Sequence, residues 1–168
     1  MQEDTKIAED EHSQTVSARM SMTVLVMQET MCGSVWGYAV EAKGAGNGKV
    51  AEQIADDMAT IGMAKERVIV KADQERAITE VQNKIVEIRS NFGTAVEQSK
   101  VGDSNSNGKI ERAIQDYKGL ARTLMSMLSR KVGSKISLDH PIATWLVRHV
   151  GHLITMRRFR DHGKLHIS

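Results

Sequence analysis

The chain has 168 residues, of which 40% are hydrophobic, 26% charged and 4% aromatic, and its formal net charge is +2. This length and composition predict one folded domain and exclude a disordered or fibrous chain. The sequence contains no stretch of eighteen apolar residues, so we expect no transmembrane helix and no membrane partner. The polar residues 1–12 do not resemble a secretory or transit peptide, and the single cysteine, Cys32, excludes an internal disulfide. An intracellular location is therefore expected.

The small net charge hides a strong asymmetry along the chain. Residues 109–168 contain 12 Lys and Arg against 4 Asp and Glu, a net of +8, whereas residues 1–108 contain 11 against 17, a net of −6. Such a split predicts a basic surface near the C-terminus that meets a polyanion. The alternative is an ordinary solvated helix face.

The first half of the chain reads as two strands followed by a helix. Residues 1–18 lack an apolar rhythm and are expected to form a polar tail, a loop or the remnant of a strand. Residues 22–28 and 35–40 are rich in β-branched and apolar residues and predict an antiparallel hairpin. Residues 43–49 (KGAGNGK) form a glycine-rich break, and residues 50–62 then repeat apolar side chains at helical spacing.

The second half alternates strands and helices. Residues 67–71 predict a short buried strand, residues 75–89 a helix and residues 93–98 another strand. After the polar segment 101–108, a long helix is expected from near Gly108 to Gly133. Its apolar stripe consists of Ile110, Ile114, Tyr117, Ala121, Leu124 and Leu128.

The only proline, Pro141, predicts the start of a last helix. The order strand, strand, helix, strand, helix, strand, helix, helix indicates an α/β fold with one packed sheet and flanking helices.

Two common motifs are considered and set aside. The glycine-rich segment 43–49 lies where phosphate loops lie, but Val50 stands where a Walker motif needs Ser or Thr, so a flexible connection is favoured. His149 and His152 are three residues apart on the last helix, with His140 upstream. They lack the glutamate of the H-E-x-x-H motif, so packing or surface roles are favoured over metal binding.

Two carboxylates are better placed for chemistry. Asp73 follows a predicted strand at its carboxyl end, where α/β sheets bind ligands, although helix capping is an alternative. Glu111 is expected in the first turn of the long helix, opposite the apolar stripe. Its face continues through Gln115, Lys118 and Arg122. A carboxylate followed by cations suits an enzyme that holds a metal and nucleic-acid phosphate; a dipole-stabilised glutamate followed by solvated charges is the alternative.

These segments resemble a known family. NGKIERAIQDYKGLARTL (residues 107–124) is similar to the glutamate helix of the integrase catalytic core of retroviruses and, more closely, of copia-type retrotransposons. KADQERA (residues 71–77) resembles the segment of the second catalytic aspartate, and VWGYAV (residues 35–40) resembles an early strand of that core. The resemblance covers roughly residues 20–155 and keeps the order of the Asp and Glu motifs.

The resemblance implies a ribonuclease-H-like fold, in which helices flank a mixed sheet of about five strands, and an Asp, Asp, Glu trio that holds two Mg²⁺ or Mn²⁺ ions for DNA strand transfer or nicking. By position, Asp73 is the second carboxylate and Glu111 the third. The residues that it assigns to DNA binding are Lys118, Arg112, Arg122, Lys109 and Asn107, of which Asn107 also shapes the helix entry. DNA is then the expected partner, with a homo-oligomer as a further expectation and the nucleus as the location.

The first catalytic aspartate does not lie in a recognisable strand. Asp4 is the first choice and Asp10 the second. We therefore divide the chain into a polar segment 1–18 that holds the remnant of a first strand, an integrase-like core over 19–158 and a basic tail over 159–168. Two alternatives remain: a degenerate remnant that binds nucleic acid without chemistry, and a helical oligomerisation module built from the last two helices.

Overall fold

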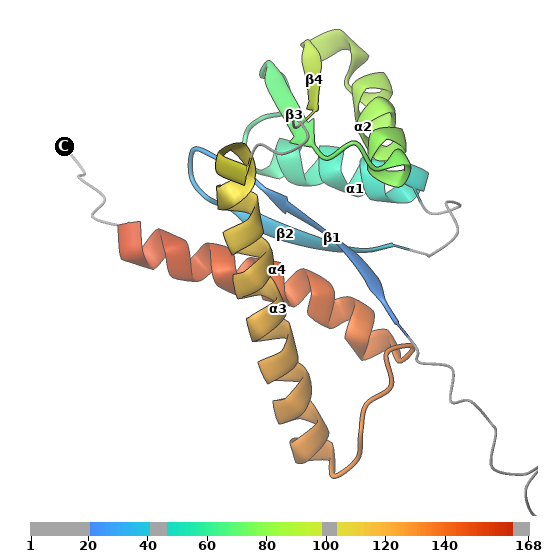
Figure 1. Ribbon diagram of the computed structural model, residues 1–168, viewed down its shortest axis with the longest axis vertical. Helices are drawn as coiled ribbons and strands as arrows, with labels where there is room; N and C mark the ends of the chain where they lie inside the picture. The colour runs from blue at the N-terminus through green and yellow to red at the C-terminus, as the bar shows by residue number, and fades with distance from the viewer. Residues whose placement is uncertain (1–20, 41–46, 99–103, 163–168) are drawn as a thin grey trace, which may run out of the picture.

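The computed structural model describes residues 21–40, 47–98 and 104–162, and this part of the chain is an α/β structure with four α-helices and four strands (Figure 1). The elements follow one another in the order predicted from the sequence, with one short 3₁₀ helix added. They are β1 (Thr23–Gln28), β2 (Val35–Val40), α1 (Asn47–Thr60), β3 (Val68–Ala72), α2 (Arg76–Ile88), the 3₁₀ helix Ser90–Phe92, β4 (Thr94–Gln98), α3 (Ser104–Val132) and α4 (Pro141–His162).

The predicted hairpin is confirmed. β1 and β2 pair antiparallel, with Leu25 opposite Tyr38 and Val24 opposite Ala39. Because successive side chains of a strand point to opposite faces, these two pairs lie on different faces of the hairpin. Both faces are apolar, which is the pattern of a sheet covered by helices on each side.

Helices cover the two faces of the hairpin in two separate hydrophobic clusters. On one face α3 and α4 pack against the hairpin, and the buried members of this cluster are Val35, Ala113, Tyr117, Leu146, Val147, Val150 and Ile154. On the other face lie α1 and α2, and the buried members there are Tyr38, Val50, Ala51, Ile54, Met58, Val81 and Ile85. The hairpin is therefore the middle layer of the molecule (Figure 1).

Two small residues let neighbouring elements approach the hairpin closely. Gly151 of α4 lies against the backbone of β2, where a Cβ atom would stand only 2.8 Å from the carbonyl oxygen of Val35. On the same face, the ring of Tyr117 packs across Gly37. The Tyr117 hydroxyl then donates a hydrogen bond to the carbonyl oxygen of Val147, which links α3 to α4.

The second strand pair is parallel. β3 pairs with β4 in a register that places Val68 beside Thr94 and Ala72 beside Gln98. α2 is the connection between these strands, as parallel pairs require. Arg89, at the end of α2, is 3% exposed, and its guanidinium donates hydrogen bonds to the hydroxyl of Thr94 and to backbone oxygens of the segment before β3.

The expectation of one packed sheet differs from what the structure describes. Within residues 21–40, 47–98 and 104–162, β1–β2 and β3–β4 are separate two-stranded sheets. In this part of the chain no hydrogen-bonded strand joins β1–β2 to β3–β4, so the edges of the two pairs do not meet. The two pairs share packing through α1 and α2 instead, since Val70 of β3 packs against the same cluster as Tyr38 of β2.

Candidate functional site

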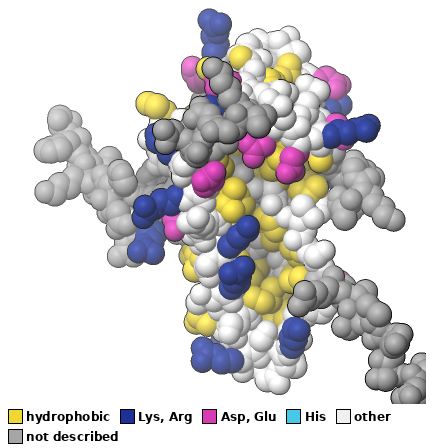
Figure 2. All heavy atoms as spheres, viewed as in Figure 1, with side chains coloured by type: hydrophobic (Ala, Val, Ile, Leu, Met, Phe, Trp, Pro, Cys, Tyr) yellow, Lys and Arg dark blue, Asp and Glu magenta, His cyan; other side chains and the backbone are white. Residues whose placement is uncertain are grey.

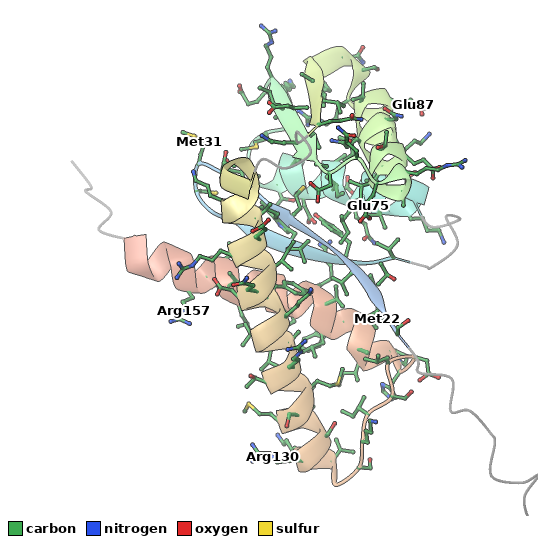
Figure 3. All side chains as sticks on the ribbon, in the orientation of Figure 1. Met22, Met31, Glu75, Glu87, Arg130 and Arg157 are labelled. Carbon is green, nitrogen blue, oxygen red and sulfur yellow. The ribbon has the colours of Figure 1, made fainter. Side chains whose placement is uncertain are left out.

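Asp73 lies directly after β3, at the carboxyl end of the parallel pair. Its side chain is exposed. The N-cap position of α2 is occupied by Glu75, which makes no side-chain capping hydrogen bond. Figure 3 shows Glu75 and Glu87 near the two ends of this helix. Asp73 therefore does not hold the N-cap position that the structural alternative would give it.

Glu111 is exposed on α3, as predicted, but the helix entry differs from the prediction. α3 begins at Ser104 rather than near Gly108, so Glu111 lies in the second turn and not in the first. Asn107 consequently stands within the helix and does not shape its entry. A glycine inside a helix costs only about 1 kcal/mol relative to alanine, and this cost did not stop α3 from extending through Gly108.

The connection from β4 to α3 limits how far α3 can begin from the carboxyl end of the parallel strand pair. β4 ends at Gln98, which is in register with Ala72, the residue before Asp73. α3 starts at Ser104, and a connection of this length spans at most about 20 Å. Glu111 follows about 10 Å further along the helix axis.

The basic residues assigned to DNA lie along α3. Lys118 and Arg122 are exposed and share a helix face with Glu111 and Gln115, so the predicted exposed face is confirmed. On the surface in Figure 2, Lys and Arg side chains follow one another down the region that α3 occupies. Figure 3 places Arg130 at the far end of this helix. The helix face of Glu111 therefore carries a carboxylate followed by the cations Lys118 and Arg122, and Arg130 adds a cation near the end of α3.

The remaining predicted DNA-binding residues have different placements. Arg112 is exposed and lies about 100° around the helix from Glu111, and Lys109 is exposed and lies about 160° around it. Lys109 is thus on another side of α3 than Lys118. For Asn107 the structure describes the helical backbone only.

The first carboxylate of the predicted trio has two candidates, Asp4 and Asp10. Asp4 and Asp10 lie outside the described residues. Among the residues that are described, no group of three or more His, Cys, Asp or Glu side chains is arranged to hold a metal ion. Asp73 and Glu111 carry carboxylate oxygens, the donor type that Mg²⁺ and Mn²⁺ prefer, and they are two of the three ligands that the family resemblance implies.

The three histidines considered in the sequence have distinct environments. The ring Nδ1 of His140 accepts a hydrogen bond from the backbone N–H of Ile142 and so caps the start of α4. His149 stacks on Trp145, with ring centroids 4.5 Å apart, and His152 lies 6.5 Å from His149. His149 and His152 therefore stack in a row with Trp145, and neither belongs to a group of three or more potential metal ligands among the described residues.

A second polar constellation was missed from the sequence. Arg148 of α4 makes two hydrogen bonds of 2.9 Å to the carboxylate of Asp57 on α1, and the hydroxyl of Tyr38 donates a third to Asp57 at 2.7 Å. The Arg148 guanidinium also lies over the Tyr38 ring, 5.4 Å from its centroid. Burial, the hydrogen bond to Asp57 and the charge of Asp57 raise the pKa of Tyr38 well above its usual value, against the opposing charge of Arg148.

The sequence contained a local signal on each of the two helices, α1 and α4, that contribute to this constellation and its surroundings. Asp57 stands three residues after Ile54 and seven after Val50, which is on the apolar stripe of α1. Trp145, His149 and His152 recur at offsets of four and seven on α4 and so share one face. Nothing in either pattern identifies the partner, because 91 positions separate Asp57 from Arg148.

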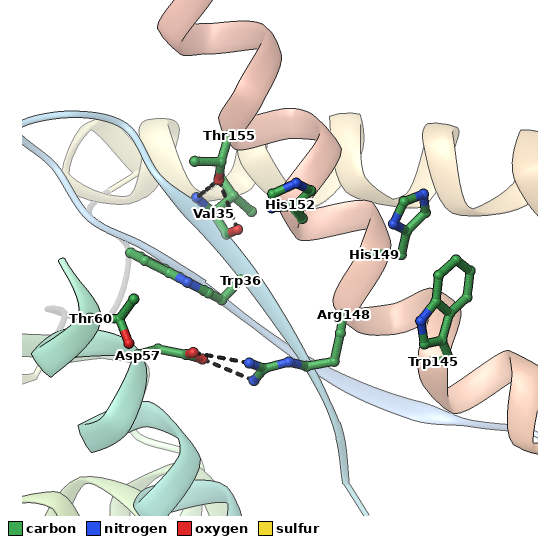
Figure 4. Close-up of a pocket in the computed structure, with 9 residues that line it drawn as sticks. All are labelled: Val35, Trp36, Asp57, Thr60, Trp145, Arg148, His149, His152 and Thr155. Carbon is green, nitrogen blue, oxygen red and sulfur yellow. Dashed lines mark hydrogen bonds and ion pairs between the residues drawn. The ribbon is translucent and has the colours of Figure 1, made fainter.

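Asp57 and Arg148 of this constellation, with neighbouring residues of β2, α1 and α4, line a cavity of about 350 Å³ between α1 and α4 (Figure 4). Arg148 crosses this cavity to reach Asp57, and Trp145 and His149 lie to one side of it (Figure 4). Thr155 contributes a hydroxyl that accepts a hydrogen bond from the N–H of Val35 and donates one to its carbonyl oxygen. The backbone of β2 is therefore already satisfied at this point.

Comparison with models of protein families and with curated proteins found no match to this chain. In the described part of the chain, no helix combines the length and the hydropathy that a membrane crossing requires.

Proposed function

We propose that this chain is an integrase-like catalytic core of retrotransposon origin, which transfers or nicks DNA strands with the help of divalent cations. The observation that carries the proposal is the relation of two carboxylates to the parallel strand pair. Asp73 follows the carboxyl end of β3, and the chain leaves the same end of β4 to enter the helix that exposes Glu111. Open α/β sheets bind their ligands outside the carboxyl ends of strands.

A ribonuclease-H-like fold is the finer architecture that we propose. An antiparallel hairpin, a parallel pair connected by a helix, and helices on both faces of the hairpin support it. One further strand between β1 and β3 would join the two pairs into a mixed sheet of five strands. The family resemblance implies that this strand carries the first catalytic aspartate, for which Asp4 remains the first choice.

The described residues would divide the work between metal binding and DNA binding. Two Mg²⁺ or Mn²⁺ ions, when bound, would activate the attacking oxygen and stabilise the leaving oxygen at phosphorus. Asp73 and Glu111 would offer carboxylate oxygens to them, and both side chains are exposed to solvent. Lys118 and Arg122, on the face of Glu111, would bind phosphate groups of the DNA and hold the strand in register.

The test is metal-dependent nicking and strand transfer by the full chain on a fluorescein-labelled DNA duplex end. Wild-type protein should process the duplex when Mg²⁺ or Mn²⁺ is added and should not do so in excess chelator. Glu111→Gln removes the charge and keeps the shape of the side chain, so activity should fall to the level of the metal-free reaction. Glu52→Gln, an exposed glutamate on α1, makes the same change elsewhere and should leave activity intact.

Lys118→Ala is expected to weaken DNA binding and to reduce the salt dependence of binding by about one phosphate contact.

Unchanged activity in Glu111→Gln would overturn the catalytic proposal. DNA binding that falls with salt, without any metal-dependent nicking in the wild type, would instead identify the chain as a degenerate remnant that binds nucleic acid.

A further inference from the structure

The cavity between α1 and α4 has no part in the proposed metal chemistry. Trp36 of β2 and Asp57 of α1 line one side of it, and Trp145, Arg148, His149 and His152 of α4 line the other. Its volume of about 350 Å³ falls at the lower end of the range of small-molecule sites.

The walls of the cavity are held in place before any ligand arrives. Arg148 is bound at both terminal nitrogens by Asp57 and stacks on Tyr38, so it joins α4 to α1 and to β2. Thr155 satisfies both backbone groups of Val35, which prevents a foreign strand from pairing with β2 there. An added peptide strand is therefore a poor occupant.

The exposed aromatic rings favour a planar ligand. The side chain of Trp145 is 55% exposed, although tryptophan is costly to leave in water, and one neighbour of its ring is the stacked ring of His149. His152 is also exposed beside this pair. Unpaired nucleobases stack on Trp and His rings, and the ring nitrogens of histidine can hydrogen-bond base edges.

The charge of α4 favours a nucleic-acid ligand over an apolar one. The sequence of this helix contains four arginines and one aspartate, a net of +3. Arg148 lines the cavity, whereas Arg157 is exposed on another side of α4, about 140° around the helix from His152 (Figure 3). A groove that combines cations for the backbone with aromatic rings for the bases is the usual arrangement for single-stranded nucleic acid.

We infer that this cavity binds an unpaired nucleobase of a single-stranded nucleic acid, stacked against Trp145 beside His149 and His152. The inference uses none of the proposed metal ligands. A failure of Glu111→Gln to alter catalysis would leave it standing, and its own failure would leave the proposed metal chemistry standing.

The experiment compares two single-stranded probes of equal length and charge, a fluorescein-labelled thymidine oligonucleotide and an abasic oligonucleotide. Both are about ten nucleotides long, within the range of ~4–16 nucleotides that one such domain covers. The full chain should bind the thymidine probe more tightly and with quenching of its tryptophan fluorescence. Trp145→Ala should weaken binding of the thymidine probe by about 5- to 100-fold, since each stacked base contributes on that scale, and should leave abasic binding unchanged.

His152→Ala should weaken binding in the same direction by a smaller factor, which keeps the test decisive if the tryptophan variant folds poorly. Met156→Ala is the matched control, because Met156 is 50% exposed on the same helix and does not line the cavity. Equal binding of the two probes by the wild type would overturn the inference. Normal binding of both probes by Trp145→Ala would also overturn it. If this variant in addition sedimented as a monomer where the wild type sediments as a dimer, the face would be a contact between copies of the chain.

Discussion

The two strand pairs of this molecule differ in how completely helices cover them. Both faces of the hairpin are buried, and Val35 and Tyr38, on opposite faces, are each 0% exposed. The parallel pair has α2 on one face, and on its other face Ile69 is 67% exposed. Since buried apolar area is the main source of stability, the hairpin layer should carry most of it.

This difference in coverage predicts which strand pair is the less stable of the two. Local opening begins where few apolar contacts are made, so β3–β4 should open before the hairpin does. Asp73, a proposed metal ligand, lies at the end of this less covered strand pair. A further strand or a bound ion that adds contacts at this end would therefore raise the stability of the parallel pair.

The largest expected effect tests the contrast in packing directly. Ile54 of α1 is 2% exposed against the hairpin, so Ile54→Ala should lower the free energy of unfolding by about 3 kcal/mol through lost burial and the cavity that remains. Ile69→Ala makes the same change on the open face of β3 and should alter it by less than about 0.5 kcal/mol. Urea denaturation followed by circular dichroism measures both. Equal losses would mean that the open face of the parallel pair is covered in solution.

The sequence predicted the elements of both regions well, because each depends on a short local pattern. The hairpin of residues 22–28 and 35–40 and the helical stripe through Ile110, Ile114 and Tyr117 were predicted correctly, and the apolar side chains of both are buried or partly buried. The period of apolar residues is a property of neighbours in the chain, so no distant partner is needed to recognise it.

What the sequence could not supply depends on distant partners. The pairing of sheet edges is one example: no local feature of β1 or β3 says whether another strand lies beside it, so one sheet was expected and two pairs are described. The ion pair of Asp57 with Arg148 is another, since the local pattern around either residue does not identify a partner 91 positions away. For the candidate site, the order of Asp73 and Glu111 was available from motifs, whereas the true start of α3 at Ser104 was not.

A second prediction sharpens the comparison within the helices that cover the hairpin. Gly151→Ala places a methyl group against the backbone of β2, which cannot move aside as a flexible side chain would, and should destabilise the fold by about 2 kcal/mol. Gly119→Ala is the matched change on α3, where nothing lies within 4 Å of the added atom. It should stabilise the helix by about 1 kcal/mol. Thermal unfolding should therefore shift in opposite directions, and two shifts of the same sign would contradict the close packing of α4 on β2.

A dependence of stability on pH reports on the hairpin layer, because the only two tyrosines of the sequence, Tyr38 and Tyr117, pack on its two faces. Burial raises the pKa of each above the usual value of 10.0, and for Tyr38 the hydrogen bond and charge of Asp57 raise it further. Below pH 10 both the folded and unfolded states hold these protons, so their contribution to stability is complete. Above pH 10 the unfolded chain loses them first, and stability should fall by about 1.4 kcal/mol per pH unit for each tyrosine.

Urea denaturation at a series of alkaline pH values measures this slope, and phenolate absorbance shows when the rings ionise. Tyr117→Phe removes one titrating group and should cut the tyrosine part of the slope by about half. The variant also loses the hydrogen bond to Val147, but this loss lowers the stability equally at every pH below the folded pKa and does not change the slope. An unchanged slope would mean that Tyr117 ionises as readily in the folded protein as in the unfolded chain. The α3 face of the hairpin would then be open to water, and the contrast between the two strand pairs would rest on the α1 face alone.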